Sequence, residues 1–338
     1  MKIHNLILLA LLAVSCGKSL NNDLFIPEDS NPSAAAQKEE AVWSDEVVSD
    51  GMIYHKMIGY EPITAAQQII HVLEVDLNNP RYKVRLFHQR QESRVEKTAI
   101  TTADAVEETG AVAGINGGYA VMDVFAKVDG IIIDEQMRAE AATGIPQWKN
   151  EGAMYLNTDK ESGKSLVEIR FDGRGMNVDQ QRAFYRAQPD ENIISSAPML
   201  IESGDPVGER FVDPPLTVAD AMKLGYEDPR RHQTQWHPRT AVAMTRDNHI
   251  LLVVVDGRRT NVAEGINAAD LTRFLVKHFD PLSALNLDGG GSSTMVVKGS
   301  KSASPSNYVV NYPSSSDYLD HTHLRQVPTH ILIVDAQK

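Results

Sequence analysis

Short apolar runs separated by polar turns recur along the chain and predict β-strands. Residues 68–76 and 83–87 are rich in β-branched and other apolar side chains, and they flank Asn78-Asn79-Pro80. This arrangement predicts strand, turn, strand. Residues 102–109 predict a helix with a hydroxyl residue at its start. Residues 111–115 then predict a buried strand that leads into a turn of Asn, two glycines and Tyr.

The later half of the chain repeats this order. Residues 240–244 and 249–255 predict two strands around a polar turn, and Asn267 opens a helix that we expect to end near Phe279. A further strand at 284–287 leads into Asp288 and two glycines. We therefore predict two related β-β-α-β units whose final turns face one another across a pseudo-twofold axis and build one site.

The segment between these units, residues 148–238, contains a predicted strand at 166–171 and polar, proline-containing stretches at 213–215 and 228–232. No clean linker separates two cores. The sequence therefore predicts one α+β domain over residues 51–338, with a mixed, mainly antiparallel sheet and packed helices.

The N-terminus has the features of a secretion signal. Lys2 supplies a positive charge, residues 6–12 an apolar core, and small residues precede Cys16. This pattern resembles a bacterial lipoprotein signal, so we expect a signal peptide over 1–16, a lipid on Cys16 and a flexible tether over 17–50. A signal peptide that merely contains a cysteine is the alternative. The lipoprotein interpretation predicts a cell-envelope location, outside the cytoplasm, with membrane attachment through the N-terminal lipid.

Charge and cysteine content narrow the choice of partners. The 338 residues carry 33 Lys and Arg against 45 Asp and Glu, a formal net charge of −12. This excess of acid works against general binding to nucleic acid or anionic lipid, so an anionic ligand must be met by locally placed arginines. Cys16 is the only cysteine, which rules out a disulfide within the chain. The oligomeric state is left open.

The run from Asn286 to Thr294 contains the strongest chemical signal. Asp288 stands at the end of a predicted strand, and three glycines and three hydroxyl residues follow it. Glycines let a ligand approach the backbone closely, so this turn is a candidate binding or catalytic site. A flexible surface loop is the alternative.

Two further residues stand beside predicted strands. Asp256 follows the apolar strand 250–255, where it either serves a site or caps its own turn. Arg239 precedes another strand, and its planar guanidinium suits a phosphate or carboxylate, although an isolated arginine is more often an ordinary surface residue.

Metal and nucleotide chemistry receive little support. His321 and His323 form a pair without a third ligand, and the glycine run lacks the Gly-Lys-Ser/Thr ending of a phosphate-binding loop. We predict no metal site and no cofactor. A calcium or magnesium ion bound by the acidic turns stays an open alternative, although the sequence has no recognisable metal-binding loop.

Six segments occur along the chain in one order. They are Asn116-Gly117-Gly118-Tyr119, His237-Pro238-Arg239-Thr240-Ala241, Asp256-Gly257-Arg258, Asn286 to Thr294, Asn311-Tyr312-Pro313-Ser314 and Arg325-Gln326-Val327-Pro328. Taken together, they resemble the phosphodiester glycosidase family, which includes the lysosomal enzyme that uncovers mannose 6-phosphate. The resemblance extends from about Met52 to the C-terminus. Tyr119 departs from the family, in which another aromatic such as Phe is usual, and the segment before Arg325 is long and contains histidines.

The resemblance implies hydrolysis of the glycosidic bond of a sugar 1-phosphodiester, with release of free sugar and a phosphomonoester. It implies Asp288 as nucleophile or general base, Asp256 as second carboxylate or positioning group, and Arg239 with Arg258 as phosphate donors. The implied substrate contacts are Asn116, Gly117, Tyr119, Thr240, Arg258, Gly289, Gly290, Ser292, Ser293, Asn311 and Arg325.

Two other functions stay open. The same turns would serve a non-catalytic carbohydrate-binding lipoprotein of the cell envelope. A metal-dependent phosphoesterase, which would cleave the phosphorus–oxygen bond, requires a cluster of metal ligands that the sequence does not supply.

Overall fold

The computed structural model describes residues 40–88, 99–119, 124–133 and 147–337. Cys16, the predicted signal peptide and the first part of the predicted tether lie outside these ranges. Within them, no helix is both long and apolar enough to cross a membrane. The strands are β1 (Val42–Ser49), β2 (Met52–Glu61), β3 (Ala66–Asp76), β4 (Tyr82–His88), β5 (Ala113–Asn116), β6 (Ala126–Val128), β7 (Ile131–Ile132), β8 (Gly152–Thr158), β9 (Ser165–Arg170), β10 (Asn192–Ser196), β11 (Met199–Ile201), β12 (Arg239–Met244), β13 (His249–Val255), β14 (Ser283–Asn286), β15 (Met295–Val297) and β16 (Thr329–Asp335). The helices are α1 (Thr102–Thr109), α3 (Val178–Ala187), α4 (Val218–Ala221), α5 (Pro229–Thr234) and α6 (Ala268–Phe279), with short 3₁₀ turns η2 (Gln147–Asn150), η3 (Val207–Arg210) and η4 (Gly290–Ser292).

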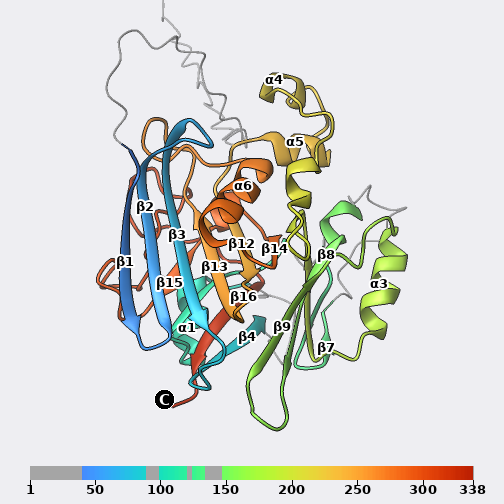
Figure 1. Cartoon of the computed structure of the whole chain (residues 1–338), viewed down its shortest axis with the longest axis vertical. Helices are drawn as coiled ribbons and strands as arrows, with labels where there is room; N and C mark the ends of the chain where they lie inside the picture. Colours follow the sequence, from blue (N-terminus) through green and yellow to red (C-terminus); the bar gives the residue numbers. More distant parts are fainter. Residues whose placement is uncertain (1–39, 89–98, 120–123, 134–146, 338) are drawn as a thin grey trace, which may run out of the picture. The chain divides into compact units, whose positions relative to one another are not determined.

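These strands form three sheets, and the pairs of named strands are all antiparallel. The largest has seven strands in the order β1-β2-β3-β13-β12-β14-β11 (Figure 1). A five-stranded sheet has the order β7-β6-β10-β8-β9, and a four-stranded sheet the order β15-β5-β16-β4. Helices pack on these sheets, so the predicted α+β class with mainly antiparallel pairing is confirmed.

Strand β13 explains the long apolar run in its sequence. Its alternate residues Ile250, Leu252 and Val254 belong to a core shared by all three sheets. The intervening Leu251 and Val253 belong to a second core on the opposite face, where α6 packs. Because both faces of β13 are covered, polar residues have no place in its interior.

Helices α1 and α6 have the bounds that their sequences predict. The side chain of Thr101 accepts a hydrogen bond from the backbone of Asp104, and Gly110 ends α1 in a left-handed conformation. Asn267 caps α6 in the same way, through the backbone of Asp270. Such caps satisfy N–H groups that have no partner inside the helix.

The predicted β-β-α-β repeat is present as an order of elements but not as an equal pairing of strands. In the later unit, β13, β12 and β14 are neighbours in one sheet. In the earlier unit, β3 lies in the seven-stranded sheet, whereas β4 and β5 lie in the four-stranded sheet with β16 between them. The final turns of the two units nevertheless meet.

The folded region begins earlier than the sequence predicts, because β1 lies within the predicted tether. Val42 pairs with Ile58, and Trp43 packs against Phe274 of α6 at 5.9 Å between ring centroids. The exposed valines of this edge strand, Val42 and Val47, obscure its alternating pattern. The tether boundary at residue 50 is therefore wrong, and residues 42–49 belong to the sheet.

Candidate active site

The ends of β5 and β14 meet through the side chain of Asn116. Its amide nitrogen donates to the backbone oxygen of Asp288 at 2.7 Å. Its oxygen accepts from the hydroxyl of Thr240 at 2.8 Å and from the backbone of Thr294 at 3.1 Å. The backbone of Asp288 in turn donates to the oxygen of Gly117 at 3.2 Å. Three segments far apart in the sequence are thus held at one point.

This arrangement changes the interpretation of three predicted substrate contacts. Asn116 and Thr240 are fully buried, and the protein itself uses their polar groups. A β-carbon on Gly117 would lie 2.4 Å from the hydroxyl oxygen of Thr329, so this glycine is needed for packing. We interpret all three as residues that position the turns and do not touch a sugar.

Asp288 lies where the buried strand opens to solvent. It is half-buried, as are Gly289 and Gly290, whereas Leu287 and Gly291 on either side are buried. A hydrogen bond from the Ser292 hydroxyl and charge from Arg325 and Lys149 favour the ionised form, but burial outweighs them and raises the pKa of the carboxyl. Asp288 is therefore a half-buried residue whose carboxyl has a perturbed pKa.

The three glycines bring the backbone close to other groups. Gly289 leaves no room for a side chain, because a β-carbon there would lie 2.5 Å from the backbone oxygen of Pro238. Gly290 adopts φ of +62°, which favours glycine, and its N–H donates to the same Pro238 oxygen at 2.8 Å. We call residues 288–291 the glycine corner.

Two guanidinium groups border the glycine corner. A β-carbon on Gly290 would lie 3.1 Å from Nη2 of Arg258, and one on Gly291 would lie 2.5 Å from Nη2 of Arg325. Arg258 itself has a left-handed backbone, with φ of +63°. Glycine at both positions therefore lets the two cationic groups approach the backbone next to Asp288.

Arg239 does not have the position predicted for a phosphate donor. Its side chain is 4% exposed, and it donates to the backbone oxygens of Ile266, His232 and Gln235 and to the side chain of Gln233. These bonds use four of its five N–H groups. Burial lowers its pKa to about 10. We therefore reassign Arg239 to holding the segment before β12 in place.

Tyr119 lies beside the glycine corner, half-buried. Its hydroxyl donates to the backbone oxygen of Ala197 at 3.1 Å, and its ring packs edge-on against Trp148 at 5.9 Å. The ammonium of Lys149 lies 5.2 Å from the centre of the same ring. Burial, and more weakly the charge of Asp288, raise the pKa of Tyr119, so it presents a neutral aromatic ring.

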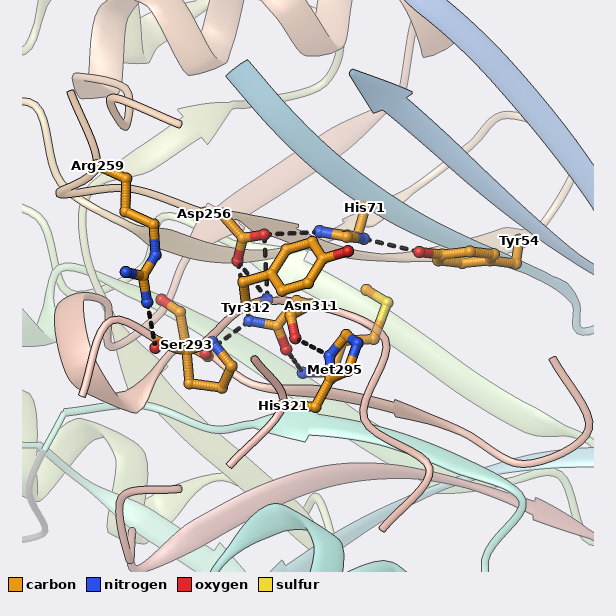
Figure 2. A network of polar contacts seen from close by, with 10 residues as sticks. Tyr54, His71, Asp256, Arg259, Ser293, Met295, Asn311, Tyr312 and His321 are labelled. Atoms are coloured by element: carbon orange, nitrogen blue, oxygen red, sulfur yellow. Dashed lines mark hydrogen bonds and ion pairs between the residues drawn. The ribbon is translucent and has the colours of Figure 1, made fainter. Parts of the chain in front are cut away.

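Asp256 lies in a buried polar network (Figure 2). The side chain is 1% exposed, and its oxygens accept from Nε2 of His71 at 2.9 Å, from the amide of Asn311 at 3.1 Å and from the backbone of Tyr312 at 3.0 Å. Since a carboxylate accepts, Nε2 of His71 donates to Asp256, and Nδ1 of the same ring lies 2.7 Å from the hydroxyl of Tyr54. The structure thus favours the positioning role among the two predicted for Asp256.

Asn311 connects this buried network to the segment after the glycine corner. Its amide nitrogen also donates to the backbone oxygen of Ser293 at 3.1 Å, and its side-chain oxygen accepts from the backbone of Met295 at 2.8 Å (Figure 2). Asn311 and Ser293 are both buried. They support the turn and are not placed to contact a substrate, unlike Arg325, which is exposed.

The sequence reasoning missed three residues at or behind the site. Lys149 belongs to no recognisable sequence motif, and only the fold places it near Tyr119 and Asp288. His71 and Tyr54 lie inside apolar strands β3 and β2. The sequence feature that points to the buried network is a histidine, His71, within the apolar run Ile69 to Val75.

Metal ligation has no support in the described ranges, where no group of three or more His, Cys, Asp or Glu side chains is placed to hold an ion. His321 instead contacts its neighbours in the fold. Its Nδ1 donates to the backbone oxygen of Asn311 at 2.7 Å, and its ring stacks on Tyr312.

Comparison with known sequences agrees with the motifs that form this site. A model of the phosphodiester glycosidase family matches residues 109–334, about two thirds of the chain. Seventy residues are 41% identical to N-acetylglucosamine-1-phosphodiester alpha-N-acetylglucosaminidase from Bos taurus and 39% identical to the same enzyme from Homo sapiens. These matches span 21% of this chain and only 13% of the length of each relative.

Comparison of structures extends the similarity of fold. The catalytic domain of the zebrafish enzyme of the same name, described as auto-inhibited by its pro-peptide, superposes with a TM-score of 0.51. The match covers 87% of this chain and 82% of the zebrafish chain at 19% identity. At this identity the likeness concerns the fold alone.

Proposed function

The chain belongs to the phosphodiester glycosidase family, and from this premise we propose that it hydrolyses the glycosidic bond of sugar 1-phosphodiesters. The products would be a free sugar and a phosphomonoester. The named activity of the bovine and human relatives supports this reaction class. The site geometry supports the chemical roles proposed below.

One observation carries the proposal, which is the presence of a carboxyl and two guanidinium groups at the glycine corner. Arg258 lies against Gly290 and Arg325 against Gly291, two and three residues after Asp288. Guanidinium groups bind phosphoryl oxygens through paired, charge-assisted hydrogen bonds. A phosphodiester held by these arginines would place the anomeric carbon of its sugar near the Asp288 carboxyl.

In the proposed reaction, Asp288 attacks the anomeric carbon or removes a proton from the water that attacks it. The bond between that carbon and the phosphate oxygen breaks, and the phosphomonoester leaves with the electron pair. Water supplies the new hydroxyl of the sugar. Because the leaving group is already a stable anion, arginine donors matter more here than protonation by a second acid.

The buried residues would support this chemistry without touching the substrate. Asp256 fixes Asn311, and Asn311 holds the backbone of Ser293, next to the Ser292 that bonds Asp288. Asn116 holds the backbone of Asp288 itself. Such support keeps a catalytic group within a narrow range of positions.

Product analysis tests the proposal. The full chain would be incubated with sugar 1-phosphodiesters, aryl glycosides and aryl phosphates in ¹⁸O-labelled water. We expect turnover of the first class alone, with label in the free sugar. Label in the phosphate product would show a phosphoesterase, and saturable binding without turnover across the panel would show a carbohydrate-binding protein; either result contradicts the proposal.

We also propose that the protein is held at the cell envelope by a lipid on Cys16. The proposal rests on Lys2, the apolar residues 6–12 and the small residues before the cysteine. Replacement Cys16→Ser should release the protein from membranes in a fractionation experiment. Retention in the membrane fraction would contradict lipid attachment at this residue.

A further inference from the structure

A cavity of about 390 Å³ lies beside the five-stranded sheet and contains none of the residues assigned to the glycine corner. Its volume falls within the range typical of small-molecule pockets. Trp148, Phe171, Met199 and Phe211 give it apolar walls. Three acidic residues and three arginines also line the cavity.

The charged groups differ in what they can offer a ligand. Arg210 pairs with Asp205 at 2.6 Å, and Arg230 pairs with Asp228 at 2.7 Å, so both guanidinium groups are already engaged. The remaining charged groups in the cavity are Glu151, Arg174 and Glu202.

Glu202 is half-buried, and its carboxylate makes no hydrogen bond or ion pair within the described part of the chain. Burial raises the pKa of Glu151, although the charge of nearby Arg174 opposes this effect. Arg174 lies over the ring of Phe171 at 5.2 Å. The cavity therefore offers two carboxylates as acceptors and one guanidinium as donor, next to apolar rings.

This combination suits an uncharged polyhydroxylated ligand. Carboxylates accept hydrogen bonds from hydroxyl groups, a guanidinium donates to hydroxyl oxygens, and aromatic side chains pack against the apolar face of a sugar ring. A phosphate is disfavoured because two carboxylates would repel it and two of the three arginines are paired.

The cavity lies close to the glycine corner. Met199 pairs with Leu285 in adjacent strands, and Asp288 follows Leu285 by three residues, which corresponds to about 10 Å of extended chain. Trp148 connects the two places, since its ring lines the cavity and packs against Tyr119.

We propose that this cavity binds an uncharged sugar unit of a longer glycan, while the phosphodiester-linked sugar of the same glycan occupies the glycine corner. The role in catalysis rests on the function proposed above. A sugar unit bound in the cavity makes phosphodiester-linked oligosaccharides or polysaccharides the substrate class of this protein.

The first test is binding, which does not depend on turnover. The full chain would be titrated with neutral di- and trisaccharides of glucose and of N-acetylglucosamine up to about 10 mM, by calorimetry and ligand-observed NMR. We expect saturable binding that Glu202→Ala and Arg174→Ala each weaken about tenfold. Glu161→Ala, at an exposed turn between β8 and β9, is the matched control and should bind as the unmodified chain does.

Three results would overturn the proposal. The first is the absence of binding by every saccharide in the panel. The second is binding that neither cavity substitution weakens, with Glu202→Gln included as a variant of the same shape in case Glu202→Ala unfolds. The third is competition of inorganic phosphate with the saccharides for the Arg174 site.

Kinetics separates this proposal from the proposed function. With sugar 1-phosphodiesters of one sugar and of three, Glu202→Ala should lower the ratio of kcat/KM for the longer over the shorter substrate about tenfold. An unchanged ratio with normal turnover refutes the cavity role alone. Saccharide binding that depends on Glu202, without turnover of any phosphodiester, refutes the proposed reaction and leaves the binding site standing.

Discussion

Two aspartates of this protein have nearly the same sequence context and different surroundings. Asp256 and Asp288 each lie at or just beyond the end of a buried strand and directly before a glycine. The oxygens of Asp256 are buried and bonded to His71, Asn311 and Tyr312. Asp288 is half-buried beside Arg325. The comparison teaches that the hydrogen-bond donors around an acid decide whether its oxygens are available to a ligand.

The glycine corner also depends on the buried network. Asp256 orders Asn311, which holds the backbone of Ser293 within the segment that follows the glycine corner. The buried acid therefore stabilises the geometry of the half-exposed one. Substitutions that separate activity from stability can test whether Asp288 acts in the reaction and Asp256 supports its geometry.

Asp288→Asn should have the largest effect. Removing the acid that attacks or activates water should lower kcat about 10²- to 10⁴-fold on a sugar 1-phosphodiester. The free energy of unfolding should stay the same or increase, because burial raises the pKa of this carboxyl and so disfavours its charged form in the folded state. Near-normal turnover would show that Asp288 takes no part in the reaction. The proposed difference in function between Asp288 and Asp256 would then be wrong.

Arg325→Ala should follow, with a loss of about a hundredfold in kcat/KM for the phosphodiester. Arg325 is exposed, so thermal unfolding should change little. Arg239→Ala is the matched comparison, and it should mainly lower the melting temperature because its guanidinium is bonded inside the protein. An Arg239 variant that is stable and inactive would restore the predicted phosphate role.

Asp256→Asn should lower the free energy of unfolding by about 1.5–3 kcal/mol, measured by urea denaturation, because a buried charged acceptor loses its bonds. His71→Asn breaks the same pair from the other side and should behave alike. Asp220→Asn, in an exposed pair with Lys223, should leave stability unchanged. If Asp256→Asn were as stable as the unmodified protein and as inactive as Asp288→Asn, Asp256 would have a direct chemical role.

The smallest effect concerns pH. If ionised Asp288 is the active form, kcat/KM should rise with pH through its pKa, which lies above the ordinary value of 3.8. Arg325 lowers that pKa, so Arg325→Gln should move the acidic limb of the profile to higher pH. A limb that stays in place would mean that another group controls it.

Elements with strong local signals could be predicted from the sequence. The predicted bounds of helices α1 and α6 agree with the structure, where Thr101 and Asn267 cap them. Strand β13 was found because both of its faces are buried. Strand β1 was missed because an edge strand with exposed valines lacks a clear apolar face, and strand pairing depends on contacts that local pattern does not encode.

For the site, the sequence revealed the glycine corner but not the surroundings of each charge. Whether a guanidinium is exposed, as in Arg325, or bonded to backbone oxygens, as in Arg239, depends on segments that meet only in the fold. The same limit hid Lys149, and it placed Asn116 and Asn311 among substrate contacts when their amides are bonded inside the protein.

The hydrogen bond between Asn116 and the backbone of Asp288 has a consequence for how the protein matures. It joins residues 172 positions apart in the chain. Contacts of such separation form late, because a long loop must close first. A chain interrupted or stalled between these segments would possess many of its strands yet no aligned carboxyl, so the proposed activity would report completed folding.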